Sequence, residues 1–130
     1  MLIGIVWELW RWWSRGRLLR RWAVAVGFHY LGGALPHWFP IGPTVARGHV
    51  SHVLLGEMRG RQVVCFDYSQ SWGDTRRVMT AVAVQGFSPG ESYRYGPDAV
   101  VEEFAGWGVI HRPGRLSPRE IECLLAEAVA

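Results

Sequence analysis

The chain has 130 residues, of which 49% are hydrophobic and 19% are charged, and its formal net charge is +3. We interpret it as one domain spanning residues 1–130, because a chain of this length buries roughly two thirds of its unfolded surface. The composition excludes intrinsically disordered and fibrous proteins. Every basic side chain is arginine, and residues 1–21 hold five arginines against one acid. An anionic partner would therefore meet the N-terminal end.

Residues 1–26 form an amphipathic helical segment in which five tryptophans and five arginines fall within WELWRWWSRGRLLRRW, residues 7–22. Apolar side chains recur at helical spacing over residues 1–14 and gather on one arc. The same arc would carry Arg17, Arg20 and Arg21 if the helix continued, so we expect a break near residues 14–16. A second helix is predicted over residues 17–26, with Gly27 as its C-terminal cap.

Three kinds of partner fit this segment. Its Trp face can be buried against its own domain or against a second copy in a homo-oligomer; it can lie on an anionic membrane surface; or it can bind single-stranded nucleic acid. We rank these in that order, since no known nucleic-acid motif accompanies the segment. A membrane-spanning helix is not expected, because charges interrupt the apolar run after at most seven residues. The predicted membrane or partner contacts are Trp7, Trp10, Arg11, Trp12, Trp13, Arg15, Arg17, Arg20 and Arg21.

Residues 48–85 are predicted to form a three-stranded antiparallel meander, because alternating apolar patterns flank two turns. The first turn is expected to be a three-residue loop that ends at Gly60. In the second strand, alternate side chains point to opposite faces of the sheet. We expect the aromatic face, made by Val64, Phe66 and Tyr68, to point into the core.

Asp67 is the one carboxylate of this meander that invites a functional interpretation. Symmetric pairing of the second and third strands places it opposite Arg77, and we interpret the two as a structural pair that fixes the register. No base, nucleophile or metal cluster stands at a recognisable spacing from it, so no catalytic residue is predicted. His49 and His52 are three apart on a strand and should face opposite ways, so neither a metal site nor a cofactor is expected.

The run GHVSHVLLGEMRGRQVVCFDYSQ, residues 48–70, resembles an uncharacterised family of actinobacterial proteins. In that family a strand ending in V-L-x-G leads through a G-R turn to a strand ending in F-D-Y. A helix and a G-x-x-Y segment precede it, and residues 27–30 match that segment. The resemblance covers about residues 17–85. Family members often carry a membrane-spanning helix before this region, whereas this chain departs from them with only a short, interrupted apolar segment there. The resemblance implies no particular activity.

Residues 98–130 carry two helix signals. Asp98 can cap a helix from Ala99 to Ala105, and Ser117 with Glu120 forms a capping box ahead of apolar positions at helical spacing. We expect both helices to pack on one face of the meander. The predicted fold is therefore α+β, with N-terminal amphipathic helices, a three-stranded antiparallel meander and C-terminal helices.

Cys65 and Cys123 lack the spacing of a disulfide framework, so we expect free thiols and a cytoplasmic protein. Together with the Trp-rich segment, this suggests a location at the inner face of the cell membrane. The predicted function is non-enzymatic, either membrane-peripheral or assembly-mediating. The alternatives are a small enzyme with no recognisable motif and a nucleic-acid-binding module.

Overall fold

The computed structural model describes residues 2–40, 48–72 and 75–129; within the first helix it describes the side chains of residues 6, 7, 10 and 13–26. The elements in chain order are α1 (Leu2–Val26), β1 (His29–Gly32), β2 (His49–Met58), β3 (Arg61–Trp72), β4 (Thr75–Gln85), the 3₁₀ helix η1 (Ser92–Tyr95), β5 (Val100–Phe104), β6 (Trp107–Pro113) and α2 (Pro118–Val129). The fold class is α+β, as predicted.

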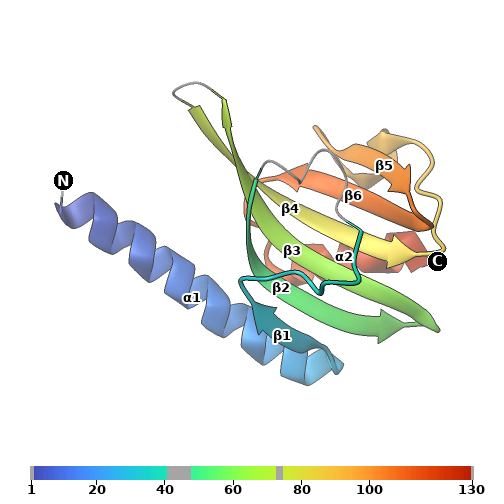
Figure 1. Ribbon diagram of the computed structural model, residues 1–130, viewed down its shortest axis with the longest axis horizontal. Coiled ribbons are helices and arrows are strands. Elements are labelled where there is room, and N and C mark those ends of the chain that lie inside the picture. Colours follow the sequence, from blue (N-terminus) through green and yellow to red (C-terminus); the bar gives the residue numbers. More distant parts are fainter. Residues whose placement is uncertain (1, 41–47, 73–74, 130) are drawn as a thin grey trace.

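The strands form one antiparallel sheet of six, in the order β1-β2-β3-β4-β6-β5 (Figure 1). The predicted meander corresponds to β2, β3 and β4, and the prediction missed the other three strands of the sheet, β1, β5 and β6. The predicted helix from Ala99 to Ala105 is wrong, because this stretch is β5. Asp98 has a positive φ of 62°, and Ala105 and Gly106 have φ of 50° and 81°. Two consecutive positive φ angles suit a tight hairpin, which pairs β5 with β6.

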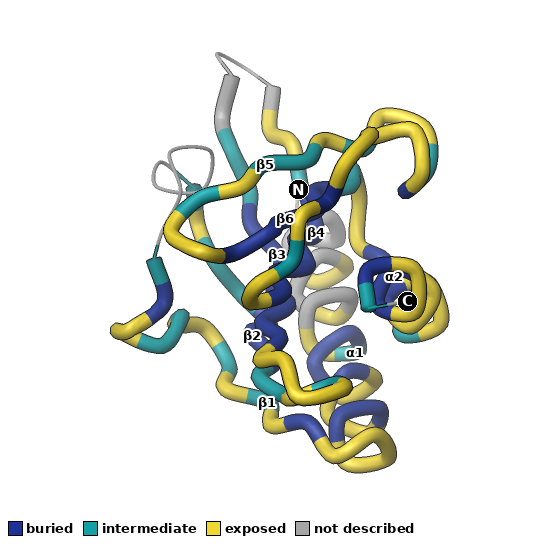
Figure 2. Tube along the Cα trace, turned by 90° about the vertical axis from the view of Figure 1, so that its right-hand side faces the viewer, coloured by how far each residue is buried: buried dark blue, intermediate teal, exposed yellow. Residues whose placement is uncertain are grey.

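Both helices cover the same face of the sheet, and loop residues 33–40 lie against the other face (Figure 2). Between the helices and the sheet lies a core that includes Leu19, Cys65 and Leu125. The opposite layer includes Phe39 and Phe66. The predicted aromatic face is therefore buried, beneath the loop. The face of Cys65 is buried as well, beneath the two helices. The sequence did not reveal that a loop would cover one face of the sheet.

α1 is one continuous helix, so the predicted break near residues 14–16 is wrong. Gly16 lies within it, where an added Cβ would come into ordinary contact with the Tyr30 hydroxyl oxygen at 3.4 Å, so α1 passes close to β1 at this point. The predicted cap at Gly27 is confirmed, with φ of 80°. The Phe28 amide donates to the Ala23 carbonyl at 2.7 Å, as in a Schellman motif.

The capping box of α2 is also confirmed. The Ser117 amide donates to Glu120 Oε1 at 3.1 Å, and the Glu120 amide donates to Ser117 Oγ at 3.2 Å. The first turn of the meander is shorter than the predicted three-residue loop, since only Arg59 and Gly60 connect β2 to β3. Both have positive φ, of 52° and 78°, which is typical of a two-residue hairpin turn.

The register of β3 and β4 differs from the predicted one. Asp67 lies opposite Thr80 and Arg77 lies opposite Gln70, so the predicted Asp67–Arg77 pair is wrong. The two strands keep pairing as far as Trp72 and Thr75, which makes the hairpin longer than expected. Residues 77 and 80 are an odd number apart, so Arg77 points to the face opposite Asp67.

Asp67 instead pairs with Arg15 of α1, and we call this contact the Arg15–Asp67 junction. Arg15 Nε and Nη2 donate to the two carboxylate oxygens at 2.6 and 2.9 Å, and Nη1 donates to the Leu116 carbonyl at 2.6 Å. Thr80 Oγ1 lies 3.1 Å from Asp67 Oδ1 and accepts the Leu116 amide. Both charged residues are more than nine-tenths buried. The junction therefore joins α1, two central strands and the segment that leads into α2.

Replacing Arg15 with Leu should destabilise the protein by about 3–5 kcal/mol, because it leaves the Asp67 carboxylate buried and unpaired. The free energy of unfolding in urea measures this. The double variant Arg15→Leu/Asp67→Leu should recover part of the loss, and Arg17→Leu, at an exposed neighbouring position, should change stability by less than about 0.5 kcal/mol. An Arg15→Leu variant no less stable than Arg17→Leu would contradict the role of the junction.

Candidate functional site on the outer face of α1

α1 turns one side to the sheet and the other to solvent. Leu18 and Val24 are also exposed on this helix, and we define the outer face as Val6, Trp7, Trp10, Trp13, Arg17, Arg20 and Arg21. With about 3.6 residues per turn, these residues fall within an arc of roughly 140°. Leu19, Trp22 and Ala23 fall on the opposite arc and are buried in the core. The helix therefore carries a core side and a solvent side at once.

The described tryptophans of the outer face are exposed to solvent over more than half of their surface. Trp7, Trp10 and Trp13 expose 57%, 55% and 54% of their surface, and Val6 exposes 62%. They lie on the side of α1 opposite its core contacts Leu19 and Ala23, and the first half of α1 also extends past the sheet (Figure 1). Single exposed apolar residues are ordinary, but a contiguous apolar patch marks a contact surface.

The aromatic and basic parts of the outer face adjoin one another. The Trp7 and Trp10 rings stack with centroids 5.5 Å apart, and the Arg17 guanidinium lies 4.8 Å from the Trp13 ring centroid. Within the described part of the chain, no carboxylate lies at ion-pairing distance from Arg17, Arg20 or Arg21. These guanidinium groups therefore keep their charge available for an anionic partner.

A shallow hollow lies within the basic part of the face. It has a volume of about 230 Å³ and is lined by Ser14, Arg17, Leu18 and Arg21. Arg17 and Arg21 are one helical turn apart, so their side chains stand on the same side of the helix. A hydroxyl and two guanidinium groups around a hollow offer hydrogen-bond donors to an oxyanion such as a phosphate group.

The predicted contact residues divide into three groups. Trp7, Trp10, Trp13, Arg17, Arg20 and Arg21 come together on the outer face. Arg15 does not belong to it, since it is buried in the junction with Asp67. The side chains of Arg11 and Trp12 lie outside the described residues.

A buried polar chain on the opposite face of the sheet was missed by sequence reasoning. Tyr68 Oη lies 2.7 Å from His111 Nδ1, and His111 Nε2 lies 2.6 Å from Glu102 Oε1. Burial lowers the pKa of His111 and outweighs the opposing effect of Glu102, whereas burial raises the pKa of Tyr68. A neutral imidazole then accepts from the Tyr68 hydroxyl and donates to Glu102.

This chain links β3, β6 and β5, and at its Tyr68 end it borders a pocket of about 370 Å³ that Asp67 and Arg115 also line. Tyr68 is 1% exposed and His111 is fully buried. No local signal could have revealed it, because Glu102 was expected in a helix and the strand that carries His111 was not predicted. Each becomes a neighbour of the other only when β5 and β6 pair.

Across residues 2–40, 48–72 and 75–129 no three His, Cys, Asp or Glu side chains gather as metal ligands would. Cys65 is buried, Cys123 is exposed, and the two are unpaired. Among the described helices, none combines the length and the apolar character needed to cross a bilayer.

Comparison of the chain with family models, with curated proteins and with solved structures gave no match. The resemblance of residues 48–70 to the actinobacterial family thus stays a prediction.

The buried imidazole of His111 makes stability depend on pH. Because burial lowers its pKa, the folded state excludes a proton that the unfolded chain takes up as the pH falls through about 6.5. The free energy of unfolding should therefore fall below that pH. His111→Gln should flatten this dependence, while His29→Gln, at an exposed position, should preserve it. Equal pH dependence in the two variants would contradict the assignment.

Proposed function

We propose that this protein is membrane-peripheral and binds anionic lipid through the outer face of α1. The observation that carries the proposal is the run of Trp7, Trp10 and Trp13 on one exposed side of a helix that projects beyond the domain. Trp side chains favour the boundary between lipid headgroups and acyl chains, because the indole ring is largely apolar but carries a polar N–H group. An interfacial helix places such residues towards the lipid and lies in the membrane plane.

The charges of the outer face support an anionic surface. Arg17, Arg20 and Arg21 continue the Trp side of the helix and add three positive charges without described carboxylate partners. A membrane with anionic headgroups complements this pattern, since each Arg near its surface contributes about 1 kcal/mol. We place the protein in the cytoplasm, at the inner face of the cell membrane, where such lipids lie.

The role we propose is binding rather than catalysis. The two clusters with the richest acid-base chemistry are the Arg15–Asp67 junction and the Tyr68–His111–Glu102 chain. Asp67 and Tyr68 line a pocket of about 370 Å³, but their side chains are almost fully buried, and the hydrogen bonds of each cluster are made within it. The accessible features of α1 are instead aromatic rings and guanidinium groups, which are typical of a contact surface.

Flotation with vesicles tests the proposal on the full-length protein. It should float with vesicles of phosphatidylcholine mixed with phosphatidylglycerol more than with phosphatidylcholine alone, and its tryptophan emission should shift to the blue. Replacing Arg17, Arg20 and Arg21 with Gln should weaken binding to the anionic vesicles by up to roughly two orders of magnitude. Added salt should act in the same direction, because it screens the charges.

Replacing Trp7, Trp10 and Trp13 with Ala should remove the part of binding that survives high salt. Matched controls lie elsewhere on the surface: Trp38→Ala changes another exposed Trp, and Arg61, Arg76 and Arg77 to Gln removes the same number of charges. Absence of flotation and of a blue shift with either vesicle would refute the proposal. A concentration-dependent dimer that the Trp variant abolishes would show instead that a second copy covers the outer face.

A further inference from the structure

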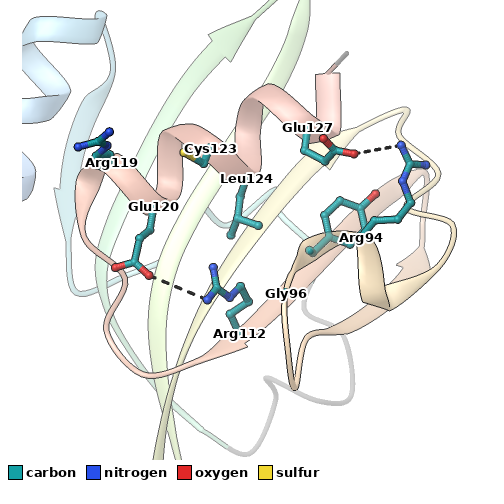
Figure 3. A pocket seen from close by; sticks show the side chains of 9 residues that line it. Arg94, Gly96, Arg112, Arg119, Glu120, Cys123, Leu124 and Glu127 are labelled. Carbon is teal, nitrogen blue, oxygen red and sulfur yellow. Dashed lines mark hydrogen bonds and ion pairs between the residues drawn. The ribbon is translucent and has the colours of Figure 1, made fainter.

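A pocket of about 410 Å³ lies beneath α2, between that helix, η1 and β6 (Figure 3). Tyr95 and Leu124 are buried and give it apolar walls. Arg94, Arg112 and Arg119 line it from three different elements. Its volume is in the range of small-molecule sites, which combine apolar walls with a few polar groups.

Arg112 is the least satisfied of these arginines. Its Nε atom is buried without a hydrogen-bond partner in the described part of the chain. Its Nη2 atom lies 4.0 Å from Glu120 Oε2, which is too far for a hydrogen bond. The guanidinium packs against Gly96, where an added Cβ would come within 3.4 Å of its Cζ and Nε atoms. Buried donors in proteins nearly always have an acceptor, so a bound ligand is a candidate to supply the missing acceptor for Nε.

The two acids of the pocket are already engaged. Glu120 accepts from the Ser117 amide at 3.1 Å, and this hydrogen bond lowers the pKa of its carboxyl group. Glu127 accepts from Arg94 at 3.1 Å. Three arginines and two carboxylates line the pocket, which gives it an excess of positive charge. Figure 3 shows Arg112 beside Glu120 and Arg94 beside Glu127, with Arg119 directed away from Arg112.

We propose that the α2 pocket binds a small organic anion. Its oxyanion head, a carboxylate or a phosphate ester, accepts hydrogen bonds from the Arg112 guanidinium, whose planar fork matches that geometry. Its apolar body lies against Tyr95 and Leu124. This site is independent of the lipid contact proposed for α1, because none of its residues belongs to the outer face.

Cys123 provides a reporter on the wall of the pocket. It is exposed, whereas Cys65 is fully buried with a pKa raised to about 12, so a neutral alkylating reagent should modify Cys123 first. The experiment measures the rate of alkylation by N-ethylmaleimide with mass spectrometry, using the full chain without vesicles. Phenyl phosphate and benzoate serve as anionic probes, and benzyl alcohol serves as the neutral control.

Both anions should slow alkylation in a saturable manner, and benzyl alcohol should not. Arg112→Gln should weaken this protection by roughly tenfold or more, whereas Arg61→Gln, outside the pocket, should leave it unchanged. Glu120→Gln should strengthen protection, since it removes a competing carboxylate while Gln can still complete the capping box. Thermal unfolding verifies that each variant is folded.

Three results would overturn the proposal: no protection by either anion, equal protection by benzyl alcohol, or full protection in a folded Arg112→Gln variant. Titration calorimetry of phenyl phosphate into Cys123→Ser gives a second measurement that does not depend on the thiol. Heat of binding that Arg112→Gln removes would support the site, and absence of binding heat together with absence of protection would refute it.

Discussion

The rest of this structure depends on the Arg15–Asp67 junction. Burying two charges is costly, and a buried pair is retained only where close geometry and further hydrogen bonds offset the loss of water. Here Asp67 receives two donors from Arg15, and the third nitrogen of the guanidinium donates to Leu116. One side chain of α1 therefore fixes the helix against β3 and against the segment that precedes α2. A shift of any of these elements would leave a charge unpaired.

The position of the junction also decides what α1 presents to solvent. Beyond Arg15, towards the N-terminus, the helix extends past the sheet (Figure 1). Towards the C-terminus the helix packs through Leu19 and Ala23. The outer face thus stays separate from the core, so its residues can serve a contact without contributing to the stability of the fold.

The two layers of the domain use polar groups differently. The helix side holds the charged junction, and beyond it the α2 pocket, whose Arg112 lacks a full set of partners. The loop side encloses the chain from Tyr68 through His111 to Glu102, in which each member has a hydrogen-bond partner. A satisfied buried network rigidifies a core, and its titration changes stability, whereas unsatisfied donors beside a cavity favour binding.

The sequence by itself determined features that depend on near neighbours: the α+β class, the strands of residues 48–85, the cap at Gly27 and the capping box at Ser117. It also placed Trp7, Trp10 and Trp13 on one side of a helix, because helical spacing is a local property. The tertiary structure decided which tryptophans are exposed, the pairing of β5 with β6, and the partner of Asp67. Arg15 and Asp67 are 52 positions apart, and no local pattern records where a helix leaves the sheet or how far a hairpin extends. Burial depends on what covers a face, and here distant segments supply the cover.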